Sequence, residues 1–397
     1  MLTGLFRAYP DYFRFWLSQA ISQVGDRVHS LALIWLVYHW SGSALAVGMI
    51  LIATSLPGIL VSPLAGVLCD RFSRRRIMIG ADLARCAVVG WLAWQAHTGQ
   101  LGYAGLIAAT VAIALASAFF NPAALAMIPG LVEREALTRA NAASQLVAGM
   151  SAVAGPLFGS ALIALIGVSP AFALNAASFL GSALFIALVR EPESARTIGA
   201  GFLDELRAGR DALRRAPLIG ALLGPVVVIN FFFAAIPVVV PVLAESVYRS
   251  GAAGLGILMS CFGCGLFAGS LLLSLGGRRR ERTVALAGFA LMGGAFLAIA
   301  LSPWLAAAGL GLVAVGIGLS IVNITLITLF QKLLDDSTRG KIMALISALA
   351  LSLQPIAYGL MGFITDALAP AGALLASGAV ILLVTLYIST LRALKEV

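Results

Sequence analysis

The sequence predicts an all-α integral membrane protein with twelve transmembrane helices, arranged as two pseudo-symmetric six-helix bundles around a central cavity. Of its 397 residues, 61% are hydrophobic and 11% are charged, and the mean hydropathy is +1.01. A soluble domain carries about 25% charged residues, so these charges are too few to build a water-facing surface. The long apolar runs lack the two-residue alternation of a membrane barrel, which leaves helices as the spanning elements.

Twelve apolar stretches are each long enough to cross a bilayer, which takes about 20 residues. They run near 13–39, 45–69, 77–97, 101–122, 143–167, 170–190, 217–243, 252–276, 283–301, 304–330, 341–366 and 369–391. Glycine is frequent inside these stretches, because small residues let membrane helices approach closely. No small-residue cleavage site follows the first stretch, so we expect it to be retained as a span.

Basic residues are concentrated in the loops that follow even-numbered spans. They are Arg71, Arg74, Arg75, Arg76, Arg134, Arg139, Arg190, Arg196, Arg207, Arg210, Arg214, Arg215, Arg278, Arg279, Arg280, Arg282, Lys332, Arg339 and Lys341. The loops near Ser41, Thr98, Val168, Ser302 and Ala369 carry none. The positive-inside rule then predicts a multi-pass protein of the bacterial inner membrane with both termini in the cytosol. Because the charges are spread over separate loops, they do not indicate nucleic-acid binding.

A polar connector divides the chain at its midpoint. We predict an N-terminal six-helix bundle over 1–190, a cytosolic linker over 191–216 and a C-terminal six-helix bundle over 217–397. Apolar residues recur at helical spacing within the linker, which is typical of an amphipathic helix on the membrane surface. Arginine triplets at 74–76 and 278–280 occupy the same place in each half, as expected for a transporter built from two related bundles.

Asp26 is the most informative single residue, because it lies near the middle of the first span. A carboxylate at that depth costs about 2.5–3.5 kcal/mol on insertion scales. The residues Gln19, Gln23, Asp26 and Ser30 share one helical face. We predict that this face lines the substrate cavity and that Asp26 alternates between proton and substrate. The alternative is an internal salt bridge, with Arg27 pairing across to another helix.

In the second half, Asn230 and Gln354 are the candidate polar contacts of the substrate cavity. Asn230 precedes three phenylalanines, and Gln354 lies one helical turn before Tyr358. Each amide can instead serve as a helix–helix hydrogen bond worth about 0.6 kcal/mol. From this pattern we expect a sparsely charged and fairly apolar cavity.

Four motifs carry a family resemblance. They are the run from Gly66 through Asp70 to Arg76, the Gly155-Pro156 pair with Gly159, the stretch from Asn121-Pro122-Ala123 to Ala140-Asn141-Ala142, and Arg339-Gly340-Lys341. With these motifs the chain resembles the major facilitator superfamily, and within it the macrolide- and siderophore-exporter-like drug:proton antiporters. Two departures are Ser73, where the family usually has glycine, and the lack of any basic residue between Gly102 and Leu131.

The resemblance implies a cytosolic gate. Its candidate residues are Gly66, Asp70, Arg71, Arg74 and Arg75, joined by the i,i+3 pair Asp82 and Arg85. An aspartate is favoured near a facing helix N-terminus, and arginine bridges helices with a forked donor. Plain positive-inside anchoring and a structural ion pair are the alternatives. In the predicted fifth span, Gly155, Pro156 and Gly159 resemble the exporter motif, although ordinary helix packing explains them equally well.

Taken together, these features predict proton-coupled efflux of a small amphipathic or lipophilic compound, such as a drug, a macrolide-like compound or a siderophore, by alternating access. Alternatives are a lipid or lysolipid translocator of the same fold and a non-transporting membrane sensor. The sequence has no nucleophile–base arrangement and no phosphate-binding glycine loop, so we predict neither an enzyme nor a cofactor. Cys261 and Cys264 are read as packing residues and not metal ligands. The expected partners are the substrate, protons and the bilayer, and we expect a monomer.

Overall fold

A computed structural model describes residues 2–190, 224, 227–275, 281–333 and 336–390. These residues form helices and short connections, and no strand occurs among them. The predicted linker with its amphipathic helix, and the arginines at 278–280, lie outside the described residues. The chain divides into two compact units, which are Met1–Val37 with Ala53–Gly199, and Tyr38–Ile52 with Ala200–Val397.

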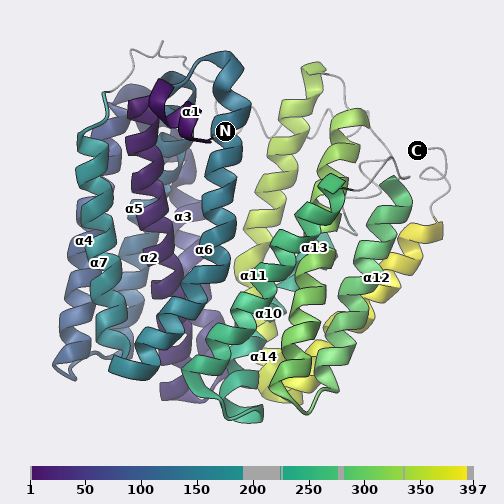
Figure 1. Cartoon of the computed structure of the whole chain (residues 1–397). Helices are drawn as coiled ribbons and strands as arrows, with labels where there is room; N and C mark the ends of the chain where they lie inside the picture. The colour runs from purple at the N-terminus through teal and green to yellow at the C-terminus, as the bar shows by residue number, and fades with distance from the viewer. Residues whose placement is uncertain (1, 191–223, 225–226, 276–280, 334–335, 391–397) are drawn as a thin grey trace. The chain divides into compact units, whose positions relative to one another are not determined.

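The first unit is a bundle of long helices (Figure 1). Its elements are α1 (Leu2–Ala8), α2 (Pro10–Ser41) as far as Val37, α3 (Ala44–Arg71) from Ala53, α4 (Arg74–His97), α5 (Tyr103–Leu131), the 3-10 turn Arg134–Ala136, α6 (Leu137–Ile166) and α7 (Val168–Ala187). Helix α4 packs between α5 and α7. This packing brings together polar side chains that lie far apart in the sequence.

The second unit combines the C-terminal helices with the segment Tyr38–Ile52, which is the turn between α2 and α3 and its flanks. Its helices are 227–233, α10 (Ala235–Val242), a π-helical turn Leu243–Val247, α11 (Gly251–Leu275), α12 (Glu281–Ala300), α13 (Leu305–Leu333) and α14 (Asp336–Thr390). Helix α13 packs against α11 and α12, and α14 packs against α10 and α12.

The described helices cover all or part of each of the twelve predicted spans. Ten helices of the described part are long and apolar enough to cross a membrane. Helix α2, with 32 residues, covers the first predicted span. Helix α14 covers the last two, because it breaks at Ala369, whose φ of 61° and ψ of 164° are not helical. The predicted all-α membrane fold is therefore confirmed.

Local sequence explains where helices stop and restart. Gly42 and Gly167 directly follow α2 and α6 and have positive φ values of 63° and 90°, which glycine adopts without a steric cost. Ser73 takes the N-cap position of α4, and its hydroxyl accepts a hydrogen bond of 3.2 Å from the Arg76 backbone N–H. The departure from glycine at position 73 thus gives α4 a cap that glycine lacks.

Aromatic side chains fasten the N-terminal end of the first unit. The Tyr12 hydroxyl donates to the Ala140 carbonyl at 2.7 Å, and the Trp16 indole N–H donates to the Ala143 carbonyl at 3.0 Å. Tyr12 is fully buried, and Leu5 of α1 lies in the same core cluster. These contacts attach α1 and the first turns of α2 to α6 near the proposed cytosolic side.

Candidate functional site

Glycines on α6 allow this helix to approach α2 closely beside Asp26. A Cβ atom at Gly155 would collide with the Arg27 side chain, and one at Gly159 would lie 3.1 Å from the Val28 Cα. Gly155, the adjacent Pro156 and Gly159 are all buried. The predicted exporter motif therefore lies at a close helix crossing, where only small residues fit.

On the other side of Asp26, Gly25 lies against α7. A Cβ atom at Gly25 would collide with the side chains of Asn175 and Ser178, both of which are buried. Because α2 is confined by α7 before Asp26 and by α6 after it, the position of this carboxylate is fixed by backbone packing. That is how a single acid can be held at a defined place in a helical bundle.

Asp26 lines a cavity of about 310 Å³ within the first unit. The lining residues are Gln19, Ser22, Gln23, Asp26, Arg27, Ser30, Arg85, Phe120 and Asn121. The four residues predicted to share a face of the first span all belong to this lining. The Ser30 hydroxyl donates to the Asp26 backbone carbonyl at 2.8 Å, so its oxygen remains available only as an acceptor.

Arg85 brings a buried positive charge from α4 to this cavity. Its guanidinium forms an ion pair with Asp82, and both side chains are almost fully buried. The Arg85 Cζ lies 4.2 Å from the ring centroid of Phe120 and 4.3 Å from that of Phe179, so the guanidinium is sandwiched between two aromatic faces. The predicted i,i+3 pairing of Asp82 and Arg85 is thus present, and it lies beside Asp26.

Two donors at the cavity have no hydrogen-bond partner among the described residues. They are the buried Nε2 of Gln19 and the buried Nε of Arg85. Buried polar groups in proteins are nearly always satisfied by protein or by water. These donors therefore indicate a place that takes water or polar ligand groups.

A second cavity, of about 170 Å³, lies within the second unit. Its lining consists of Val227, Asn230, Phe231, Phe233, Ala234, Pro237, Leu353, Gln354 and Tyr358. The Gln354 side-chain amide donates to the Tyr358 hydroxyl at 2.7 Å. The structure thus brings the two predicted amides, Asn230 and Gln354, to one cavity with aromatic walls.

Two basic residues of the predicted gate, Arg74 and Arg75, donate to backbone carbonyls inside the first unit. Arg74 donates to the Ala126 carbonyl at 2.8 Å, and Arg75 donates to the carbonyls of Ile186, at 3.3 Å, and Ala187. The bonds of Arg75 place its positive charge at the C-terminal end of α7, where a cation is favoured by the helix dipole. Among the other gate candidates, Arg71 is exposed, Gly66 has no atom within 4 Å of where a Cβ would stand, and the Asp70 side chain lies outside the described part.

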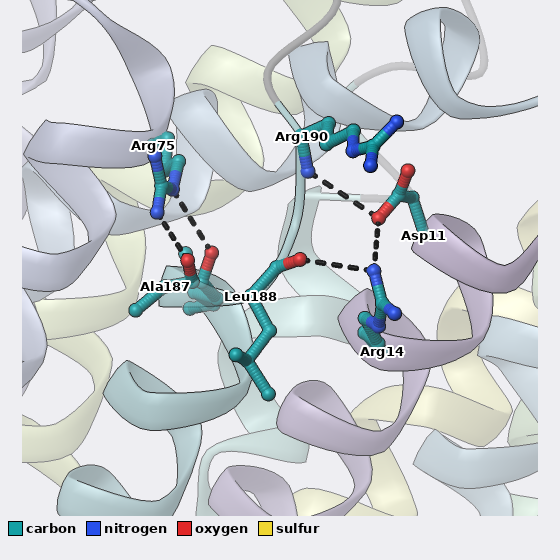
Figure 2. A network of polar contacts seen from close by, with 7 residues as sticks. Asp11, Arg14, Arg75, Ala187, Leu188 and Arg190 are labelled. Atoms are coloured by element: carbon teal, nitrogen blue, oxygen red, sulfur yellow. Dashed lines mark hydrogen bonds and ion pairs between the residues drawn. The ribbon is translucent and has the colours of Figure 1, made fainter.

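A second set of polar contacts holds the same end of α7. Figure 2 shows Arg14 donating to both the Asp11 carboxylate, at 2.8 Å, and the Leu188 carbonyl, at 3.1 Å. The Asp11 carboxylate also accepts the backbone N–H of Arg190 at 3.3 Å. The point where the chain leaves the first bundle is therefore anchored to α2 and to α4.

Asp366 and Glu245, near the opposite ends of the helices, also make polar contacts. We had predicted no role for either residue. The Asp366 carboxylate accepts hydrogen bonds from the Ser43 hydroxyl at 2.7 Å and from the Ala44 and Leu45 backbone N–H groups. Elsewhere in the second unit Glu245 pairs with His39 at 3.1 Å. A carboxylate at a helix N-terminus was not recognisable from sequence, because its partner helix is 321 residues or more away.

The expectation of a sparsely charged cavity is wrong for the first unit. Asp26, Arg27 and Arg85 all line it, and Asn121 adds an amide. Sequence reasoning missed Arg27 and Asn121 as lining residues and placed Arg85 with the gate. Helix periodicity assigns residues to faces, but it does not tell which face of α4 meets α2. Among the described residues no group of three or more histidine, cysteine or acidic side chains is placed to hold a metal ion.

Comparisons with known proteins agree with this architecture. Macrolide efflux protein A of Streptococcus pyogenes is 23% identical over 393 residues, which are 97% of this chain and 96% of that protein. The multidrug efflux pump Tap of Mycobacterium tuberculosis is 31% identical over 179 residues, or 43% of this chain and 42% of that protein.

Solved structures share the fold at low sequence identity. A bacterial homologue of the iron transporter ferroportin, in an inward-facing state, gives a TM-score of 0.73 at 14% identity and covers 96% of this chain and 99% of its own. A bacterial homologue of the human lysosomal transporter Spinster, inward-facing and unoccupied, gives 0.72 at 16% identity, with 98% and 96% covered. The family profile of the Major Facilitator Superfamily matches residues 15–357. With a profile match over most of its length, the chain belongs to the Major Facilitator Superfamily of membrane transporters and is not an enzyme.

Proposed function

We propose that this transporter exports a small amphipathic compound in exchange for protons by alternating access. The observation that carries the proposal is the position of Asp26, whose carboxylate lines a polar cavity at the middle of a spanning helix. An ionisable group in a membrane helix is costly, and such groups mark ion and substrate pathways. Proton binding at Asp26 changes the charge of the cavity wall and so changes the affinity for a substrate bound there.

The linings of the two cavities support an amphipathic substrate. The first cavity offers one carboxylate, two guanidinium groups and three amides. The second offers aromatic and aliphatic side chains with two amides, Asn230 and Gln354. Each cavity by itself therefore combines polar side chains with an aromatic wall, which Phe120 supplies in the first and Phe231 and Phe233 supply in the second. Efflux as the direction, and drugs or macrolide-like compounds as the substrate class, are suggested by the names of the relatives.

The proposed orientation places the termini and the loops rich in arginine in the cytosol of a bacterial cell. In this orientation the run from Gly66 to Arg75 faces the cytosol. We propose that it acts as a gate whose contacts are exchanged when the transporter changes state. The bonds from Arg74 to α5 and from Arg75 to the end of α7 support one stable arrangement of this loop.

Flux into proteoliposomes tests the coupling. The native protein and Asp26→Asn are reconstituted at equal density, and uptake of a fluorescent macrolide or dye is followed with and without an imposed pH gradient. We expect saturable, gradient-driven flux for the native protein and loss of the gradient dependence in Asp26→Asn, because the amide carries no exchangeable charge.

Two controls make the result specific. Asp26→Glu keeps the acid and should retain coupling, and Glu135→Gln removes an exposed acid outside the cavity and should leave flux unchanged. Gradient-driven flux that persists in Asp26→Asn would move the proton site to another acid, of which Asp82 is the nearest candidate. Flux that does not saturate and ignores the gradient would contradict the exporter proposal.

A further inference from the structure

A surface groove between α12 and α14 has a charged end and an apolar body. Its volume is about 670 Å³, and it is formed by the first turns of α12 and the last turns of α14. The lining consists of Arg282, Thr283, Leu286, Ala287, Ala290, Leu382, Thr385, Leu386 and Ser389, of which Leu286, Ala290 and Leu382 form an apolar part away from Arg282. The groove shares no lining residue with either cavity described above.

Arg282 is held at the end of this groove by a hydrogen bond from one part of its guanidinium. One of its amino groups donates to the Ser389 backbone carbonyl of α14, which fixes the side chain across the two helices. Its Nε is buried and has no hydrogen-bond partner among the described residues. The side chain as a whole is only half-buried, and its guanidinium brings a positive charge and further N–H donors to the groove, which favours an acceptor of opposite charge there.

The apolar part of the groove faces the lipid bilayer, and this indicates what kind of molecule fills it. From Arg282 to Ala290 the groove follows α12 for eight residues, or about 12 Å at the helical rise. This is most of the depth of one leaflet, since the hydrocarbon core is about 30 Å thick. Water is not a stable occupant at that depth, whereas an acyl chain is chemically matched to leucine and alanine walls.

The orientation of α12 identifies the leaflet. Three arginines, 278–280, directly precede α12 in the sequence, so the positive-inside rule puts this end of the groove at the cytosolic face. That leaflet carries anionic phospholipids, and basic residues at its surface attract their headgroups. This step depends on the topology proposed above.

We propose that the α12–α14 groove is a binding site for one anionic phospholipid of the cytosolic leaflet. The headgroup phosphate accepts hydrogen bonds from the Arg282 guanidinium and the Thr283 hydroxyl. One acyl chain lies along Leu286, Ala290 and Leu382. The lipid is a bound component of the second unit and not the transported compound.

Native mass spectrometry of the full-length protein tests this site. The protein is titrated in detergent with phosphatidylglycerol or with phosphatidylethanolamine of identical acyl chains. We expect tighter retention of phosphatidylglycerol, and a loss of about fivefold in its affinity in Arg282→Gln, the factor that corresponds to roughly 1 kcal/mol per basic residue at the membrane surface. Arg282→Lys should restore most of the preference. Ala290→Phe, which fills the groove, should lower retention of both lipids.

Matched controls separate the groove from general surface effects. Arg76→Gln removes an exposed arginine from the first unit, and Ala306→Phe adds a ring at an exposed position of α13 outside the groove. Neither should change lipid retention. Equal affinity for the two lipids, or unchanged phosphatidylglycerol binding in a monodisperse Arg282→Gln protein, overturns the proposal. The readout here is the mass of bound lipid and not flux. A negative result for lipid binding therefore leaves the exporter proposal unchanged, and a negative flux result leaves the lipid proposal unchanged.

Discussion

The Asp366 carboxylate accepts a hydrogen bond of 2.7 Å from the backbone N–H of Ala44, the first residue of α3. Asp366 belongs to α14, so an acid of one helix caps the N-terminus of another helix in the same unit. The Leu45 N–H donates to the same carboxylate at 3.0 Å. Glycines reinforce this contact, because a Cβ at Gly362 would lie 2.7 Å from the Ala44 carbonyl oxygen.

Replacing Asp366 with Asn should loosen the segment Tyr38–Ile52. The amide keeps one acceptor oxygen but replaces the other with a donor, and it removes a negative charge that contributes about 0.3–1 kcal/mol at the N-terminus of α3. We expect faster maleimide labelling of Ala44→Cys, a buried position, in a background without the four native cysteines. The matched control is Glu135→Gln. Unchanged labelling of Ala44→Cys would show that the cap does not hold the segment.

Gly66→Ala should affect thermal stability and transport flux differently. A Cβ at Gly66 meets no atom within 4 Å, and alanine is the better helix former by about 0.5–1 kcal/mol. We therefore expect unchanged or higher thermal stability of the purified protein. We also propose that one of the exchanged gate contacts closes on this glycine in the other state, so flux should be slower. Gly294→Ala, also free of neighbours within 4 Å, is the control. Normal flux in Gly66→Ala would contradict a gating role for this residue.

The Asp82–Arg85 pair should behave as one unit. Arg85→Met leaves the Asp82 carboxylate buried without its partner, which typically costs about 3–5 kcal/mol. We expect a large fall in thermal stability for Arg85→Met, and partial recovery when Asp82→Asn is added. A double-mutant cycle on melting temperatures in detergent measures this coupling. If the two single changes simply add, the pair is not coupled.

Arg75→Gln should weaken the end of α7. It removes the bonds to the carbonyls of Ile186 and Ala187 (Figure 2), and a cation at a helix C-terminus contributes about 0.3–1 kcal/mol. We expect a small fall in melting temperature that diminishes in high salt, because screening reduces the contribution of the native arginine. Arg76→Gln, at an exposed neighbour, should have no such effect. A fall of the same size in Arg76→Gln would assign the effect to loop charge in general.

The spans were predictable because membrane burial selects apolar residues over a fixed length, but helix ends were not. Helix α5 runs to Leu131 although the apolar stretch was expected to end near 122. It continues through Pro122 and Pro129, which membrane helices tolerate. Helix α6 begins at Leu137, where the polar residues of its first turn resemble a loop. Helix α1 was missed because seven residues are too few for a periodic pattern.

Within the candidate site, helical spacing correctly grouped residues of the same helix, such as Gln19 with Asp26. It also predicted the Asp82–Arg85 pair. What sequence could not supply is which helices are neighbours. The placement of Arg85 between Phe120 and Phe179 depends on α4 packing between α5 and α7. The capping of α3 by Asp366 depends on pairing residues from opposite ends of the chain.

Helix α2 is divided between the two units. It is one continuous rod from Pro10 to Ser41, yet its last turn, from Tyr38, belongs to the second unit while the rest belongs to the first. A helix resists stretching along its axis, so a displacement imposed at Tyr38 either bends the rod near Val37 or is transmitted toward Asp26, about 18 Å back along the axis. An unbent α2 would therefore carry any axial shift of Asp26 to Tyr38, so the segment that carries the acid also reaches into the second unit.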